Sequence, residues 1–261
     1  MNSTIACAIF CLMPLAALSQ ESTTNITPKM PTFTSSAELG FLYKTGNTKS
    51  ADIKTGYDLS YENGLWRSLL NIDLLAKKTE TTLDDGEEDF ETSDQKWSLE
   101  SKTNYTLDAS SQNYAYGNVY YGDDRFSSYD NQSSLSAGWG YQWLKNENAS
   151  LFADIGPGFK RDVTKATETQ ESETQNSFIV QAQALYLRKI NEHVEFTQTL
   201  SAKYAPKTDA NSTYKAESTI TTKLIDTLQL KFSIIFEHNT EVAVDKEKTD
   251  TQTAMTLVYS F

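Results

Sequence analysis

Apolar and polar residues alternate along most of this chain. The clearest example is the segment SADIKTGYDLSYE, where every second residue from Ala51 to Tyr61 is apolar, aromatic or threonine. The residues between them are polar, charged or glycine. Successive side chains of a β-strand point to opposite faces, so this period of two predicts a strand with one apolar and one polar face. We therefore expect strands that contact an apolar phase on one side only.

Twelve segments of strand length carry this pattern. They span approximately residues 36–44, 49–61, 65–77, 95–107, 113–122, 131–143, 150–159, 177–188, 194–203, 213–224, 228–238 and 250–261. The pattern leaves the apolar face undecided in the fifth, seventh and eighth segments. An even number of antiparallel strands returns both ends of the chain to the same side.

The connections between these segments alternate in length. Those after the second, fourth, sixth, eighth and tenth segments are short, such as ENG and IDT. Those after the odd-numbered segments are longer and more polar, except for TGNT after the first. Outer-membrane barrels combine short periplasmic turns with longer extracellular loops. We therefore expect an all-β fold, a closed antiparallel transmembrane β-barrel of about 12 strands in residues 36–261.

The apolar faces are expected to point outward, into lipid. If twelve strands closed with their apolar faces inward, the lumen would be too wide for these side chains to fill. A closed barrel also satisfies every backbone polar group within hydrocarbon. Aromatic residues lie near predicted strand ends, as in interfacial girdles: Tyr43, Tyr61, Trp66, Trp97, Trp143 and Tyr259. A soluble periplasmic β-barrel binding protein is the alternative.

The N-terminal segment has the form of a signal peptide. An apolar stretch from Ile5 to Leu18 precedes Ser19, with small residues at the −3 and −1 positions. We expect cleavage after residue 19, a polar leader over residues 20–35, and export to the bacterial outer membrane. Both cysteines, Cys7 and Cys11, fall inside the signal peptide. The remaining chain is therefore expected to contain no disulfide and no thiol nucleophile.

The C-terminal segment ends in the middle of an alternating pattern. It resembles the assembly signal of bacterial outer-membrane proteins, which has a final aromatic residue, an aromatic two positions earlier and alternate apolar residues behind it. The matching residues are Met255, Leu257, Tyr259 and Phe261. This resemblance implies that the barrel-assembly machinery is a partner during biogenesis.

The charge distribution restricts the partners. The chain has 35 acidic and 23 basic side chains and a net charge of −12, which argues against nucleic acid. The acidity is concentrated in residues 80–94, which we expect to form a solvated surface loop. Its carboxylates lack the spacing of an EF-hand. Bridging by divalent cations to lipopolysaccharide phosphates is the weaker hypothesis for this segment. No cofactor or metal site is predicted.

The polar faces of the predicted strands carry charges of both signs, which are expected to face the lumen. This set comprises Glu38, Lys44, Asp52, Lys54, Asp58, Arg67, Asp73, Lys77, Lys96, Glu100, Lys102, Lys215, Glu217, Lys223, Lys231 and Glu237. Unpaired buried charges are costly, so near balance of the two signs favours pairing. These residues could form a salt-bridged plug or line a narrow aqueous path, and twelve strands allow either.

The sequence offers little for catalysis. His193 falls in a predicted periplasmic turn, and His238 lies at the outer end of the eleventh segment. Nucleophilic catalysis needs a nucleophile and a base within hydrogen-bond reach, and no motif supplies such a pair. We predict no enzyme and no catalytic residue. An outer-membrane lipid hydrolase with a site near His238 remains the alternative.

Three segments resemble the DUF481 family, also described as YdiY-like or salt-induced outer-membrane proteins. They are residues 37–67, with a Gly-Asn turn, residues 120–143, with an Asp-Arg-Phe stretch and a Gly-x-Gly strand, and residues 153–162, with a Gly-Pro-Gly element. The resemblance implies an outer-membrane β-barrel without an established activity, in contact with membrane lipids and lipopolysaccharide. It implies a structural or narrow-pore role linked to osmotic stress, and it does not indicate an oligomeric state.

Overall fold

The computed structural model describes residues 31–44, 50–82, 88–107, 112–125, 127–166, 171–208, 210–242 and 247–261. The predicted signal peptide and most of the predicted leader lie outside this part. Within it the chain forms β1 (Thr32–Lys44), β2 (Ser50–Asn63), β3 (Trp66–Thr82), β4 (Glu88–Thr106), β5 (Asn113–Asp124), β6 (Tyr129–Lys145), β7 (Ala149–Thr164), β8 (Thr174–Lys189), β9 (Val194–Tyr204), β10 (Thr213–Lys223), β11 (Leu228–Asn239) and β12 (Thr249–Ser260). No helix among the described residues is both long and apolar enough to cross a membrane.

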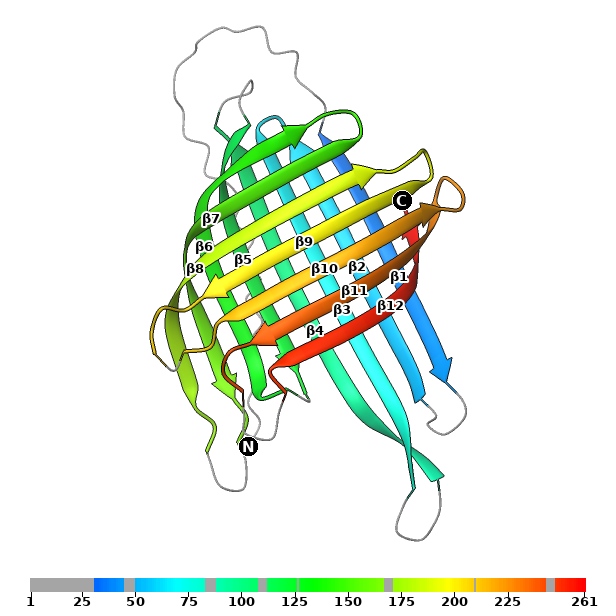
Figure 1. Ribbon diagram of the computed structural model, residues 1–261, viewed down its shortest axis with the longest axis vertical. Coiled ribbons are helices and arrows are strands. Elements are labelled where there is room, and N and C mark those ends of the chain that lie inside the picture. Colours follow the sequence, from blue (N-terminus) through cyan, green and yellow to red (C-terminus); the bar gives the residue numbers. More distant parts are fainter. Residues whose placement is uncertain are drawn as a thin grey trace, which may run out of the picture.

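The twelve strands close into one barrel (Figure 1). Each strand pairs antiparallel with the next, and β1 pairs with β12 from Ser36↔Ser260 to Leu39↔Leu257. Phe261 extends this closure, since its backbone N–H donates to the carbonyl of Ser35 at 3.0 Å. The start of β1 and the end of β12 therefore lie at the same end of the barrel. We call it the turn end, because the connections after β2, β4, β6, β8 and β10 are also there, and the opposite end the loop end.

Polar residues build the short turns. Gly64 has a φ of 59°, a left-handed conformation that glycine adopts without strain, and it reverses the chain between β2 and β3. Asn146 accepts backbone N–H bonds from Asn148 and Ala149 through its side chain. Asn191 does the same for His193 and Val194. Such Asx turns explain why these connections can be short.

The outer surface of the barrel is apolar. Its exposed residues include Phe33, Leu39, Phe41, Ile53, Leu74, Val119, Leu135, Ile155, Phe159, Leu200, Ile220, Phe236, Met255 and Leu257, and all four tryptophans are 40–62 % exposed. A soluble protein rarely exposes so large a continuous apolar surface. The outward direction of the apolar faces, predicted above, is confirmed.

Aromatic pairs mark the two edges of this apolar belt. On the outer face Trp66 contacts Tyr105 near the turn end, and Trp97 contacts Tyr121 nearer the loop end. Tyr105 and Trp97 lie eight residues apart on β4. At about 3.3 Å per residue and a tilt of about 40°, that separation spans roughly 20 Å across the membrane. This height suits the apolar band of an outer-membrane barrel, which is about 25 Å tall.

Twelve antiparallel strands in a closed transmembrane barrel were predicted and are confirmed, but the boundaries of five strands were wrong. β1 begins at Thr32, inside the predicted leader. β3 continues to Thr82 and β4 begins at Glu88, so most of residues 80–94 is strand and not loop, while residues 83–87 lie outside the described part. β7 and β8 are also longer than expected. Strand pairing continues beyond the apolar belt, where alternation is no longer imposed by lipid.

The central part of the β6–β7 pair depends on glycine. A Cβ atom added to Gly138 would collide with the backbone of Ile155 and Gly156, and one added to Gly156 would collide with the backbone of Ala137 and Gly138. The two backbones therefore approach more closely than side chains permit. Pro157 lies beside this contact and has no N–H for the ladder.

We predict that Gly138→Ala and Gly156→Ala each lower the stability of the folded barrel by about 1–3 kcal/mol, because a side chain forces two backbones apart. The measurement is unfolding in urea in detergent micelles. Gly117→Ala is the matched control, since nothing lies within 4 Å of a Cβ at that strand position. Equal stability of all three variants would show that the close approach does not matter.

Candidate functional site in the barrel lumen

The predicted lumen charges occupy strand positions that alternate with the exposed apolar ones. On β3, for example, Arg67, Asp73 and Lys77 alternate with exposed Trp66 and Leu74. The same alternation holds for the others in the set on β1, β2, β4, β10 and β11, although the side chain of Lys44 lies outside the described part. Their role in lining a path or a plug stays a prediction.

One ion pair crosses the interior from β4 to β7. The Lys102 ammonium donates to Asp154 Oδ2 and to Gln183 Oε1 on β8, both at 2.5 Å. Tyr114 on β5 donates to the same Asp154 oxygen at 3.0 Å, and Lys102 also lies over the ring of Tyr116. β4 and β7 are not neighbours in the barrel. Contacts between these side chains therefore pass through the lumen and tie its walls together.

Two further lysines reach other inner side chains. Lys231 on β11 pairs with Glu38 on β1 at 2.6 Å, across the intervening β12. Lys203 on β9 lies 3.8 Å from the centre of the Tyr120 ring on β5. A buried carboxylate needs a charged or hydrogen-bonding partner, and Lys231 supplies one to Glu38.

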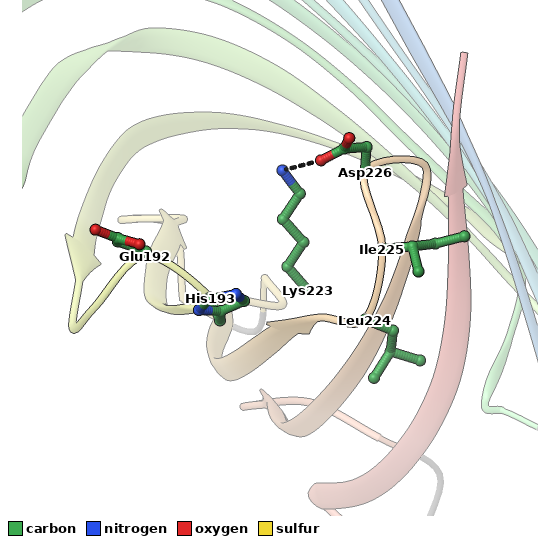
Figure 2. Close-up of a pocket in the computed structure, with 6 residues that line it drawn as sticks. All are labelled: Glu192, His193, Lys223, Leu224, Ile225 and Asp226. Atoms are coloured by element: carbon green, nitrogen blue, oxygen red, sulfur yellow. Dashed lines mark ion pairs between the residues drawn. The ribbon is translucent and has the colours of Figure 1, made fainter.

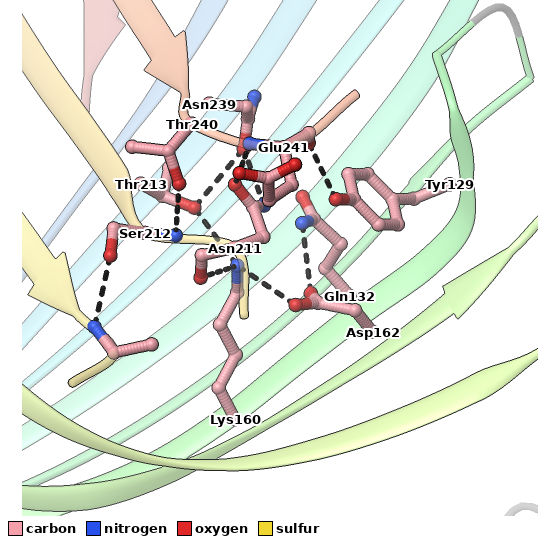
Figure 3. A network of polar contacts seen from close by, with 11 residues as sticks. Tyr129, Gln132, Lys160, Asp162, Asn211, Ser212, Thr213, Asn239, Thr240 and Glu241 are labelled. Atoms are coloured by element: carbon pink, nitrogen blue, oxygen red, sulfur yellow. Dashed lines mark hydrogen bonds and ion pairs between the residues drawn. The ribbon is translucent and has the colours of Figure 1, made fainter. Parts of the chain in front are cut away.

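A buried polar network lies at the loop end (Figure 3). Lys160 on β7 is 3.1 Å from the carboxylate of Asp162 and donates to the backbone carbonyl of Asn211 at 3.2 Å and to Thr213 at 3.0 Å. Gln132 donates to the other oxygen of Asp162 at 2.9 Å. Lys160 and Asp162 are almost completely buried. The network holds the connection between β9 and β10 against the inner side of the β7–β8 hairpin.

The same network extends to β11 and β6. The side chain of Asn211 donates to Asn239 at 2.9 Å, and the hydroxyl of Tyr129 donates to the backbone carbonyl of Glu241 at 2.6 Å (Figure 3). Ile179 packs with Ala205 and Ala210 beneath it. Since β6 and β11 are far apart around the barrel, these bonds bridge part of the loop-end mouth.

The lumen is packed on one side and open on the other. On the inner faces of β5–β9, the packed half, many polar residues are buried, including Asn118, Ser134, Ser136, Asp154, Lys160, Asp162, Ser177 and Gln181. On β1–β4 and β10–β12, the open half, burial among the described inner-face residues is confined to Glu38, Gly40, Thr219, Ser233, Thr256 and Val258. Asp73 is exposed in the middle of β3, and the Lys215 side chain on β10 is 42 % exposed.

Sequence reasoning missed most residues of the packed half. Asp154, Lys160 and Asp162 lie on β7, where Gly156, Pro157 and Gly158 replace the regular pattern and left the apolar face undecided. Their spacing could have identified them, because all three have even residue numbers and therefore lie on the same face of the strand. Lys203 could have been found by its alternation with Leu200, Ala202 and Tyr204, whereas the contacts of Asn211 lie in a connection without periodicity.

The two histidines lie outside the lumen network. His238 on β11 has its Nδ1 atom 2.8 Å from the Thr249 hydroxyl, and its ring lies near that of Tyr214. His193 borders an open cleft of about 340 Å³ at the turn end (Figure 2). The other residues lining this cleft are Glu192, Lys223, Leu224, Ile225 and Asp226, none of which carries a hydroxyl or thiol. Lys223 and Asp226 pair there at 3.0 Å.

The described part of the chain contains no group of three or more His, Cys, Asp or Glu side chains arranged to hold a metal ion. Residues 83–87, the centre of the acidic segment, lie outside that part. The hypothesis that this segment binds cations therefore stays open.

Comparison with known proteins finds a sequence relative, solved barrels of low similarity and a matching family. It is 27 % identical to the uncharacterized protein YdiY of Escherichia coli K12 over 236 residues, covering 87 % of this chain and 83 % of that protein. The COG4313 outer membrane channel of Pseudomonas putida F1 superposes with a TM-score of 0.46 at 11 % identity, covering 92 % of this chain and all of the other. The translocator domain of the autotransporter NalP of Neisseria meningitidis has a TM-score of 0.44 at 9 % identity, covering 88 % of this chain and 87 % of the other. The model of the family of unknown function DUF481 matches residues 37–261, and the chain, a closed β-barrel, belongs to this family.

Proposed function

We propose that the protein forms a narrow, water-filled passage for small hydrophilic solutes across the outer membrane. The observation that carries this proposal is the exposure of Asp73, an inner-face residue in the middle of β3. A lumen filled by protein would bury this side chain. Lys215, at an inner-face position near the loop end of β10, is also 42 % exposed. Open space beside charged groups is the lining that a hydrated ion requires.

The packed half explains why the passage is narrow. Twelve strands enclose more space than the filled barrels of eight strands and less than porins of sixteen or more. Part of that space is occupied by Tyr114, Tyr116 and Tyr120, and by the cross-barrel contacts of Lys102 and Lys203. The part of the lumen that these side chains leave unfilled lies along the open half.

A purely structural barrel is the second candidate. The observation in its favour is the extent of the buried network around Lys160, which ties four strands together at the loop end. In that case the open half would contain no continuous aqueous path. Conductance separates the two candidates.

The cellular setting is also part of the proposal. We infer export by a signal peptide cleaved after residue 19 and insertion by the barrel-assembly machinery, read from Met255, Leu257, Tyr259 and Phe261. The exposed apolar belt then contacts membrane lipids and lipopolysaccharide. A link to osmotic or salt stress suits a passage for small ions, since its closure or loss changes envelope permeability.

Planar-bilayer recording of the refolded barrel is the first test. We expect uniform conductance steps in dilute KCl, because the proposed passage runs along the open half. A silent bilayer, with folding verified by circular dichroism, would favour the structural barrel. Phospholipid hydrolysis that is lost in His238→Ala would instead revive the lipid hydrolase.

Cysteine accessibility tests the asymmetry of the lumen. The chain beyond residue 19 contains no cysteine, so a single introduced thiol is unique. We predict that Asp73→Cys in the folded barrel reacts rapidly with a charged methanethiosulfonate reagent. Ser136→Cys is the control from the packed half, where the residue is 2 % exposed, and it should react slowly. Equal rates at the two positions would contradict the division into halves.

The packed half is expected to stabilise the barrel. Lys102→Met leaves the carboxylate of Asp154 buried without its cation, and we predict a loss of about 3–5 kcal/mol in urea unfolding. Lys223→Met is the control, because its pair with Asp226 is largely exposed and should matter by less than about 1 kcal/mol. Similar losses in both variants would show that the cross-barrel pair has no special role.

A further inference from the structure

A carboxylate-lined recess lies on the open half around Gly56. Gly56 on β2 pairs with Glu38 on β1 and Asp73 on β3, so the three residues form one row on the inner face. From the point where a Cβ of Gly56 would stand, the Glu38 carboxyl carbon and Asp73 Oδ1 are each 3.6 Å away. The absence of a side chain at Gly56 leaves a gap between two carboxylates.

A third carboxylate completes the recess. Asp58 is the next inner-face residue of β2, and Asn71 donates a hydrogen bond to it at 2.6 Å. Asp58 is also within electrostatic range of Glu38 and Asp73. We call Glu38, Asp58 and Asp73 the carboxylate recess.

One carboxylate of the recess is only partly satisfied. Lys231 pairs with Oε1 of Glu38. The second oxygen, Oε2, is buried and has no hydrogen-bond partner among the described residues, and Glu38 is only 6 % exposed. An unpartnered buried carboxylate oxygen beside Gly56 is an acceptor that points to a positively charged ligand.

Several other inner lysines have partners outside the recess. Lys102 is bound to Asp154, Lys160 to Asp162, and Lys203 lies over Tyr120. Lys215 is 3.7 Å from Glu217 on its own strand. Lys54 on β2 and Lys77 on β3 also occupy inner-face positions, but among the described residues Asp58 and Asp73 form no ion pair.

We propose that the carboxylate recess makes the passage selective for monovalent cations, which cross it with most of their water. The inference rests on the proposed function, because it needs an open lumen. The three carboxylates do not converge as metal ligands do, since no metal-binding group is found in the described part of the chain. A hydrated K⁺ or Na⁺ needs only a negative electrostatic potential and oxygen atoms that accept hydrogen bonds from its water, and the carboxylates of Asp73 and Glu38 supply both.

The test is the reversal potential of the bilayer-reconstituted barrel under a KCl gradient near 0.1 M, where charges are screened only beyond about 10 Å. We expect the wild type to pass K⁺ in preference to Cl⁻. Asp73→Asn and Asp58→Asn should each lower the K⁺ to Cl⁻ permeability ratio by about threefold, as expected for loss of one unit charge close to a hydrated ion. Asp226→Asn is the matched control, because its side chain is 98 % exposed at a turn, and it should leave the ratio unchanged.

Each outcome is decisive. Steps without cation preference would overturn the selectivity inference and leave the passage itself standing. If Asp73→Asn and Asp58→Asn both retain the cation preference of the wild type, the carboxylate recess is not its source. Absence of conductance in the folded wild type would overturn the passage and this inference together.

Discussion

The structure depends on the requirement that no backbone polar group is left unpaired in hydrocarbon. For strands this requirement is met only by closure, and β1 meets β12 to provide it. Once the sheet is closed, alternate side chains must face lipid, so the exterior is apolar from Phe33 to Phe261. Charged side chains such as Asp73, Lys102 and Lys231 are thereby directed to the inside.

Confining the charges to the inside creates a second requirement, because the lumen must satisfy them. On the packed half this is done across the barrel, with Lys102 reaching Asp154 and Gln183, and Lys160 reaching Asn211 and Thr213. These contacts fill part of the lumen and pair the ammonium groups of Lys102 and Lys160. What remains on the open half is a narrower region with Asp73 exposed and Glu38 only partly satisfied. The stabilising network and the proposed passage thus follow from one constraint.

Sequence reasoning succeeded where lipid imposes a period of two. It predicted twelve strands, their order and their closure, because residues such as Ile53, Leu74 and Phe232 must face hydrocarbon. It failed where other forces act. The β3–β4 hairpin continues past the membrane through backbone pairing alone, so the acidic segment was wrongly expected to be a loop. The Lys160 network depends on a connection, around Asn211, whose position is decided by tertiary contacts and has no periodic signal.

The orientation of the tryptophans tests the lipid-facing exterior most directly. All four, Trp66, Trp97, Trp139 and Trp143, lie on the outer face. In vesicles made with lipids brominated on their acyl chains, their fluorescence should be strongly quenched, while iodide in the water should have little effect. Quenching by iodide without quenching by the brominated lipids would contradict a membrane-spanning barrel with an apolar exterior.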